Sequence, residues 1–354
     1  MARRPLTRAV AKSGTASSRR RSSGRSPRAR GGTAAAARAP KRAAPPPAPL
    51  SAGDHDSATD AYFGLTPAES AYATSRVVIL PVPFGGTVTY GPGTENGPEA
   101  IRVASQQVEL FDEETRREPY RLGIHSAPPV VVKGKAPEPM VLEVERRVRR
   151  YLRDGKFVVT LGGEHSISPG AVKPYAEAFE GLTVVHFDAH SDLRESYHGT
   201  RHNHACAGAR MREHARLIQL GIRSQSPEER AVIERGDVET LFAYQMAEGG
   251  WSERILATIP ERTPVYVTID LDYFDPSIMP STGTPEPGGG EWYPTLRFLK
   301  GLSVRARIVG FDVMELAPVP GLHAPDFLSA RLVYKLLAYA LGAPQSGREV
   351  AGSR

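Results

Sequence analysis

Ionisable side chains directly follow an apolar run in the stretch VVHFDAHSDLR, residues 184–194. Residues 184–187 are typical of a buried strand. Asp188, His190 and Asp192 then occupy every second position. Carboxylates at the end of a buried strand are costly to desolvate unless they are paired or bind a metal. The stretch therefore indicates a binding or catalytic site that needs charged side chains.

The same arrangement recurs after three other apolar runs. The polar residues are Glu164 and His165 after 157–161, Asp270 and Asp272 after 265–269, and Asp312 and Glu315 after 307–311. In open α/β sheets the ligand site lies beyond the carboxyl ends of the strands. We therefore expect all four groups at one edge of a sheet.

The spacing indicates which side chains converge, because residues two apart in an extended chain point to the same side. Four carboxylates in one place would force some to hold protons unless cations neutralise them. Oxygen-rich ligands with some imidazole suit Mn²⁺, with Zn²⁺ as an alternative, and the lack of thiolates argues against a structural zinc site. The expected ligands of two divalent cations are His165, Asp188, His190, Asp192, Asp270 and Asp272.

Each group alone has a plainer interpretation. The residues 188–192 could form a loop held by Asx-turns, the pair Asp270 and Asp272 a solvated turn, and His165 a hydrogen-bonded surface group. Asp312 could be a structural acid, and Asp275, before Pro276, is expected to fix a turn. The recurrence at successive strand ends favours the metal site.

Strands and helices alternate along the chain. Strands are expected at 77–84, 157–163, 182–188, 217–222, 265–272 and 307–313. A Gly- and Pro-rich loop is expected at 85–102, and helices at 140–155 and 329–342. Apolar strands between helices predict an α/β fold, with a mostly parallel sheet covered on both faces.

Charge divides the 354 residues into a tail and a body. Residues 1–50 contain 13 Lys and Arg and no acid, so the net charge of +6 hides a mildly acidic body. We expect a disordered tail at 1–57, a single catalytic domain at 58–343 and a flexible C-terminus at 344–354. No apolar run is long enough to span a membrane. The single cysteine, Cys206, suits a reducing cytoplasm.

Three interpretations of the tail remain open. It could be a solvated extension or the product of a misassigned start codon. It could contact polyanions such as nucleic acid without specificity. Its Arg- and Ser-rich, acid-free composition also resembles an organelle transit peptide.

Four motifs together resemble the ureohydrolase family of arginases and agmatinases. They are GGEHS, DAHSD, TIDLDYFDP and GFDVMELAP, and GPGTENGPEAIR and LGIRS resemble the agmatinase branch. The resemblance covers roughly residues 75–343. It implies a three-layer α/β/α sandwich of the arginase–deacetylase type, two Mn²⁺ per subunit and a homotrimer or homohexamer.

The resemblance also implies roles for the site residues. The six predicted ligands match the family's metal ligands, with Asp188 and Asp270 bridging both ions. Asp192 would accept a hydrogen bond from the attacking nucleophile, and Glu315 would pair with the guanidinium group. His204 resembles the proton shuttle to the leaving amine, and a near-neutral pKa would suit that work. His198 and His202 are the alternatives for this role.

The expected reaction is hydrolysis of a guanidinium group to urea and an amine. The arginase clamp for an amino acid head group is absent from 193–211, so agmatine is the leading substrate, giving putrescine for polyamine biosynthesis. Guanidinobutyrate and aminopropylagmatine are rivals, and Arg194 or Arg201 could meet a carboxylate. A remote alternative from another class is a polyanion-binding protein with a vestigial metal site.

Overall fold

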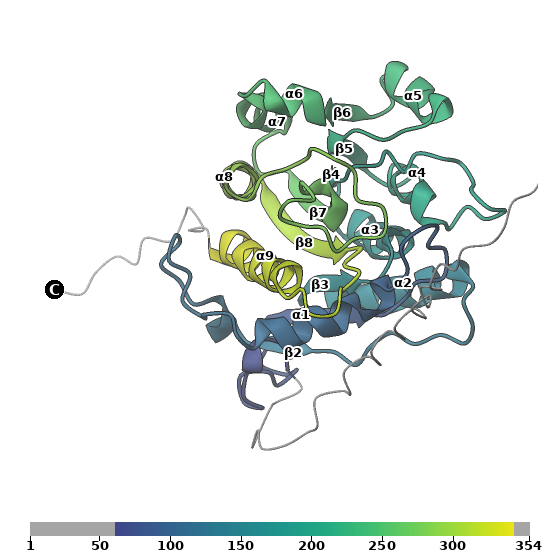
Figure 1. Cartoon of the computed structure of the whole chain (residues 1–354). Coiled ribbons are helices and arrows are strands. Elements are labelled where there is room, and N and C mark those ends of the chain that lie inside the picture. Colours follow the sequence, from purple (N-terminus) through teal and green to yellow (C-terminus); the bar gives the residue numbers. More distant parts are fainter. Residues whose placement is uncertain (1–60, 343–354) are drawn as a thin grey trace, which may run out of the picture. The chain divides into compact units, whose positions relative to one another are not determined.

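The computed structural model describes residues 61–342 (Figure 1). The predicted tail, 1–57, and the predicted C-terminal segment, 344–354, lie outside the described residues. No helix among residues 61–342 combines the length and the apolar character that crossing a membrane requires.

The centre of the described chain is a parallel sheet with the strand order β2-β1-β3-β8-β7-β4-β5-β6. Every pairing between these strands is parallel. The strands are β1 (Val77–Val82), β2 (Ile124–Ser126), β3 (Phe157–Gly162), β4 (Thr183–Phe187), β5 (Arg216–Ile222), β6 (Glu239–Phe242), β7 (Pro264–Asp270) and β8 (Arg307–Met314). The inner strands are apolar on both faces because helices cover both faces.

Helices pack on the two faces of this sheet and enclose two apolar cores. Core residues of α1, α7, α8 and α9 lie on one face, and those of α2, α3, α4 and α5 lie on the other (Figure 1). The helices are α1 (Gly97–Ser105), α2 (Pro137–Arg153), α3 (Ser168–Ala178), α4 (Ala207–Met211), α5 (Pro227–Glu234), α6 (Ala243–Ala247), α7 (Trp251–Thr258), α8 (Trp292–Arg305) and α9 (Ala324–Gly342). The predicted α/β/α sandwich is confirmed.

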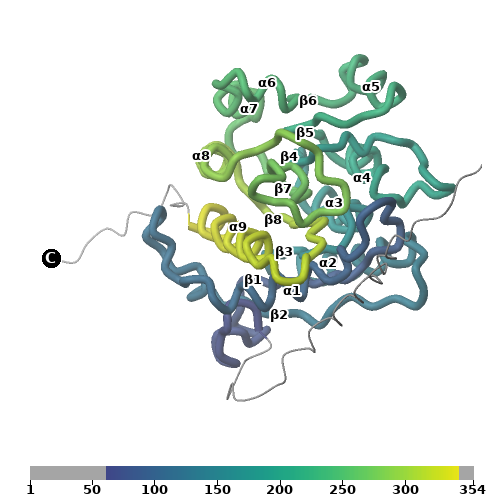
Figure 2. Tube along the Cα trace, in the orientation of Figure 1, coloured from purple at the N-terminus to yellow at the C-terminus, as the bar shows by residue number. Residues whose placement is uncertain are grey.

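Several elements differ from the sequence-based expectation, among them α1, β2 and β6, and the helices α3 to α8 were not predicted. The predicted loop 85–102 is wrong in its last part, because α1 begins at Gly97. Pro98 stands in the first turn of this helix, where a fixed φ and a missing N–H are tolerated. The strands β2 and β6 were not predicted, since they have three and four residues and are only partly buried. They form the two edges of the sheet, as the Cα trace in Figure 2 shows.

Candidate metal centre and catalytic site

The structure brings the six predicted ligand side chains together at the carboxyl ends of β3, β4 and β7. His165 begins the 3-10 helix His165–Ile167 after β3, and Asp270 ends β7. The Nδ1 atom of His165 lies 3.2 Å from Asp188 Oδ2, 3.2 Å from Asp270 Oδ2 and 3.7 Å from Asp192 Oδ2. Three carboxylates thus face one imidazole nitrogen.

The second imidazole lies on the other side of Asp188. His190 Nδ1 is 2.8 Å from Asp272 Oδ2 and 3.6 Å from Asp188 Oδ1. Asp188 therefore reaches both histidines, one with each oxygen. Asp188 belongs to two compact groups of possible ligands. One contains His190 and Asp272, and the other contains His165 and His186. In each group the ligand atoms lie within 4.8 Å of one another, close enough to hold a metal ion.

The ligand side chains converge through hydrogen-bonded turns, and not through the alternation of an extended chain that the sequence analysis expected. Asp188 Oδ1 accepts the backbone N–H of His190 at 2.6 Å, and Asp270 Oδ1 accepts that of Asp272 at 2.9 Å. Each is an Asx-type turn, in which an aspartate bonds its own backbone two residues on. One carboxylate oxygen shapes the turn, and Oδ2 of each is left to face His165.

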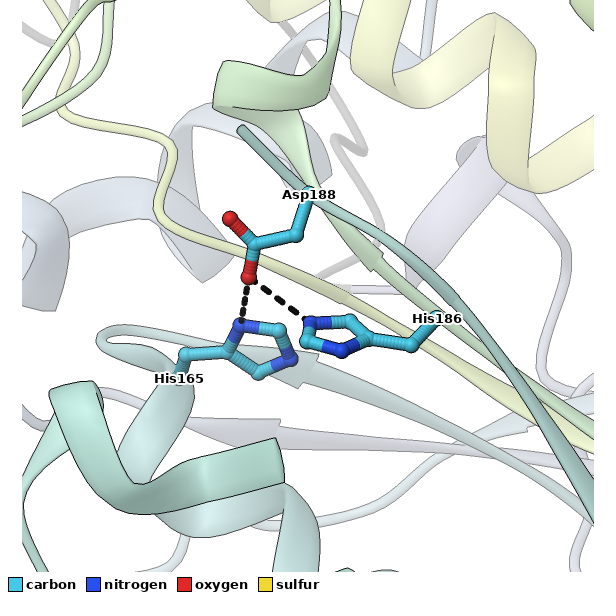
Figure 3. Close-up of side chains that lie close together, drawn as sticks. All are labelled: His165, His186 and Asp188. Carbon is cyan, nitrogen blue, oxygen red and sulfur yellow. Dashed lines mark hydrogen bonds and ion pairs between the residues drawn. The ribbon is translucent and has the colours of Figure 1, made fainter. Parts of the chain in front are cut away.

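His186 supports Asp188 and was missed by the sequence analysis. The Gln219 amide lies with Nε2 3.1 Å from His186 Nδ1, and the same Nε2 donates to the carbonyl of Ser191. His186 Nδ1 therefore accepts, and its Nε2–H donates to Asp188 Oδ2 at 2.7 Å (Figure 3). A protonated nitrogen cannot bind a metal, so His186 orients the carboxylate.

A hydrogen-bond chain behind His165 leaves its Nδ1 free for a metal. Thr268 donates its hydroxyl proton to Asp312 Oδ1 at 2.5 Å. His165 Nε2 lies 2.9 Å from the same hydroxyl oxygen, so Nε2 carries the proton and donates. This arrangement is typical of metal-binding histidines, whose second nitrogen is held by a neighbour. Asp312 is the hydrogen-bonded structural acid that the sequence left open; Tyr266 also donates to it.

The charges of the cluster fit divalent cations. Burial, with the negative charge of Asp188, raises the pKa of Asp192 well above its usual range. Burial, with Asp272 and Asp188, does the same to the pKa of Asp270. The carboxylates are therefore too crowded to remain charged together by themselves, and cations between them would remove that cost. Oxygen and imidazole ligands without a thiolate are the kind that Mn²⁺ takes.

A small cavity opens onto this cluster. It is lined by Val88, Thr89, Tyr90, His190, Asp192, His204, Asp270, Asp272, Gly283, Thr284 and Glu315. All three residues with predicted catalytic roles, Asp192, His204 and Glu315, face this cavity. His198, which is exposed, and His202 do not line it.

Glu315 and Asp192 both occupy left-handed backbone conformations, with φ of 66° and 51°. Such values are uncommon for non-glycine residues and persist where the surroundings hold them. Glu315 Oε1 accepts the backbone N–H of His165 at 2.7 Å. This bond fixes the carboxylate beside the metal ligands, and Oε2 remains for a substrate.

His204 differs from its sequence-based expectation in one respect. Burial is the largest cause of a shift that lowers the pKa of His204 to about 4. The expected near-neutral pKa is therefore wrong, because burial disfavours the charged form of an imidazole.

Arg223, another residue that the sequence analysis gave no role, holds the wall of the cavity. Its guanidinium group donates to six backbone carbonyls from β5, the turn after β7 and the loop before α8. They belong to Gly221, Asp272, Tyr273, Phe274, Glu286 and Pro287. The loop at 286–287 is thereby fixed against the turn that carries Asp272.

The two arginines that the sequence offered as carboxylate partners are engaged elsewhere. Arg194 lies within 4.0 Å of Glu229, and Arg201 is 2.7 Å from Glu213. Neither lines the cavity. Asp275 forms the expected turn, accepting the N–H of Ser277 at 2.8 Å.

Comparison with known proteins identifies the family. Residues 75–339 match the model of the Arginase family. The chain belongs to the Arginase family. It is 40% identical to the N(1)-aminopropylagmatine ureohydrolase of Synechocystis, over 76% of this chain and 90% of that one. It is 33% identical to the agmatinase of Pyrococcus horikoshii, over 73% and 90%.

A solved structure agrees with the sequence relatives. The agmatine ureohydrolase of Thermoplasma volcanium superposes with a TM-score of 0.71 at 30% identity, covering 77% of this chain and 93% of that one. The predicted arginase-type fold and the predicted hydrolase class, acting on guanidino C–N bonds, are confirmed. The family membership and the compact ligand groups also support metal binding.

Proposed function

We propose that the protein hydrolyses the guanidinium group of agmatine to putrescine and urea. The observation that carries the proposal is the acid-rich cavity at the metal cluster. In the described part of the chain no Lys or Arg lines this cavity. A substrate with a cationic guanidinium and no carboxylate matches such a lining, whereas a guanidino acid would leave its carboxylate unpaired.

N(1)-aminopropylagmatine is the second candidate. Relatives from Synechocystis and Thermus thermophilus, 40% and 37% identical, are ureohydrolases of that compound. Glu286 adds a physical reason for a tail with amino groups. Its carboxylate lies 3.9 Å from His190 Nε2, is about one third exposed, and pairs with no Lys or Arg among residues 61–342. An ammonium group leaving the cavity on that side would meet it.

Two Mn²⁺ ions complete the proposed site. The residues that would hold them are His165, Asp188, His190, Asp192, Asp270 and Asp272, of which Asp188 reaches both histidines. A pair of divalent cations lowers the pKa of a bound water and so provides a nucleophile at neutral pH. The protein must then orient the substrate and move protons.

The remaining roles fall to three side chains of the cavity. Glu315 would pair with the guanidinium through charge-assisted hydrogen bonds, which holds the guanidinium carbon over the ligand cluster. Asp192 would accept a hydrogen bond from the attacking water and orient it. His204 would take up a proton and deliver it to the amine as the C–N bond breaks.

Urea release over a guanidine panel tests the proposal. Purified protein with Mn²⁺ would be offered agmatine, N(1)-aminopropylagmatine, 4-guanidinobutyrate and arginine. We expect the two amine-tailed compounds to be hydrolysed with much higher kcat/KM than the two acids. Preference for 4-guanidinobutyrate would refute the substrate class, and no urea from any compound would refute the hydrolase.

A truncated chain separates the enzyme from the polyanion-binding alternative. Removal of residues 1–50 takes away 13 basic residues. We expect turnover to be unchanged, since the proposed site uses none of them. Loss of turnover on truncation would contradict this assignment.

Assembly and compartment are part of the same proposal. We propose a homotrimer or homohexamer in the cytoplasm, where the buried thiol of Cys206 stays reduced. Light scattering on the eluting protein would measure the mass. A monomer at working concentration would contradict the assembly.

A further inference from the structure

A chain of hydrogen bonds leads from the cavity to a buried carboxylate that the proposed function does not use. His204 lines the cavity, Thr87 lies in the loop after β1, and Glu164 follows β3, the neighbour of β1. His204 Nδ1 is 3.1 Å from Thr87 Oγ1, and Thr87 Oγ1 is 2.6 Å from Glu164 Oε1. Three segments distant in sequence thus meet through one hydroxyl group.

The direction of the bonds follows from what Glu164 receives. Its carboxylate accepts the Thr87 backbone N–H at 2.6 Å and the Ser166 hydroxyl at 2.5 Å, in addition to the Thr87 hydroxyl. Burial raises the pKa of Glu164, and the bonds from Ser166 and Thr87 oppose that shift; both carboxyl oxygens accept from these donors. The single hydroxyl proton of Thr87 is therefore committed to Glu164.

The same hydroxyl must accept from His204. Its oxygen lies 3.1 Å from the backbone N–H of His204 and 3.1 Å from Nδ1 of the ring. With its own proton given to Glu164, Thr87 can only be an acceptor for Nδ1. A neutral imidazole has one N–H, so the proton sits on Nδ1 and the lone pair sits on Nε2.

We propose that Thr87 and Glu164 are positioning residues that hold His204 as the Nδ1–H tautomer, so that Nε2 exchanges the proton in the cavity. The role in catalysis rests on the proposed ureohydrolase function. Nε2 takes up a proton released by the attacking water. When the C–N bond breaks, its electron pair passes to the amine nitrogen, which receives that proton, and His204 returns to its neutral form.

Glu164 also keeps His204 in place during this exchange. The bond from Thr87 to Glu164 keeps the hydroxyl oxygen turned toward Nδ1, so the ring stays in one orientation, as when a carboxylate orients a catalytic histidine directly. Thr87 stands between the two, so the carboxylate stays out of the cavity and cannot bind the guanidinium itself.

Kinetics of Thr87→Val test the proposal, since valine keeps the branched shape and removes the hydroxyl. We expect kcat to fall about 10-fold to 100-fold, because a positioned acid–base group is worth about 10²–10⁴ and here it is weakened rather than removed. KM and the metal content should stay close to wild type, and Thr87→Ser should restore kcat. Thr94→Val is the matched control, because the buried Thr94 hydroxyl has no partner in the described structure.

A spectroscopic measurement tests the tautomer without turnover. The protein would be labelled with ¹⁵N-histidine and loaded with Zn²⁺, which is diamagnetic, and the His204 signals would be assigned with His204→Asn. We expect a protonated Nδ1 and an unprotonated Nε2 in the wild type, and a mixture of tautomers in Thr87→Val.

Two results would overturn the inference. They are a wild-type His204 protonated on Nε2, and a Thr87→Val enzyme with wild-type kcat. Loss of metal from Thr87→Val would also overturn it, because Thr87 would then act through the ligands. A wild type that hydrolyses no guanidine would instead refute the proposed function, while the tautomer measurement would still decide the inference.

Discussion

The turns after β4 and β7 begin in the same way and are held differently. In each, an aspartate bonds the backbone N–H two residues on and keeps Oδ2 for His165. The β7 turn then closes at once in the 3-10 helix Leu271–Tyr273. The β4 turn continues for several residues without regular structure and passes through a positive φ at Asp192.

The longer turn depends on distant parts of the chain. Glu229 of α5 accepts the backbone N–H of Leu193 at 2.9 Å, and the Gln219 amide of β5 donates to the carbonyl of Ser191 at 2.7 Å. A short turn can be set by its own residues, whereas a long one must be fixed by tertiary contacts. The conformation of one half of the metal site is thus set by adjacent residues, whereas that of the other half is set by contacts with residues far away in the sequence.

The largest effect is expected when the leading aspartate of either turn loses its charge. Asp270→Asn and Asp188→Asn keep the Oδ1 acceptor but replace Oδ2 with an amide. We expect loss of at least one metal equivalent from Asp270→Asn, of both from Asp188→Asn, and near-complete loss of urea release from each. Elemental analysis and a urea assay would measure this. Two equivalents with wild-type turnover in either variant would contradict the ligand assignment.

The next effect concerns a residue outside both turns that faces the same cavity. His204→Asn should retain both metals, because His204 is not among the proposed ligands. We expect turnover to fall by about 10²–10⁴, the usual contribution of a positioned acid–base group. Parallel measurement of metal content and kcat separates proton transfer from metal binding. If a metal were lost, His204 would belong to the ligand set.

A smaller effect should follow from removing the support behind His165. Thr268→Val deletes the hydroxyl that accepts from His165 Nε2. We expect metal affinity to fall about 10-fold to 100-fold, as is usual when the partner of a ligating histidine is lost. Chelator competition would measure it. Tyr266→Phe removes another bond to Asp312 without touching His165, and an equal effect there would contradict this explanation.

The smallest effect should come from α5, the remote support of the β4 turn. Ser226 caps this helix in a capping box with Glu229. Ser226→Ala should lower the free energy of unfolding by about 1 kcal/mol, the usual cost of a lost cap. Denaturant unfolding would measure it, with Ser303→Ala, at a half-buried position in α8, as the control. Metal affinity should change little, because Glu229 keeps its bond to Leu193.

Features that recur along the chain, such as polar residues after apolar strands, were predicted from the sequence. Contacts between residues that are distant in sequence were missed. Polar residues after apolar runs were enough to predict the parallel sheet, its six inner strands and the edge at which the ligands gather. The turn geometry was misjudged, because alternation in an extended chain and an Asx-turn both bring residues i and i+2 together. Only the hydrogen bonds of Asp188 and Asp270 distinguish them.

Supporting residues gave no comparable signal. His186 looks like any strand residue, and its role depends on Gln219, 33 positions away. Thr87 and His204 are 117 positions apart. Single residues of ordinary type become informative only when the fold brings their partners to them.

Arg223 holds the cavity wall through contacts that do not involve the side chains of the wall. Its six hydrogen bonds all end on main-chain oxygens, which every amino acid possesses. These hydrogen bonds therefore do not depend on which amino acids supply the oxygens. Exchange of the side chains at 286 and 287 would leave the bonds to their carbonyls in place, together with the backbone beside Asp272. One cation thus fixes the backbone of the cavity wall independently of the side chains that the wall carries.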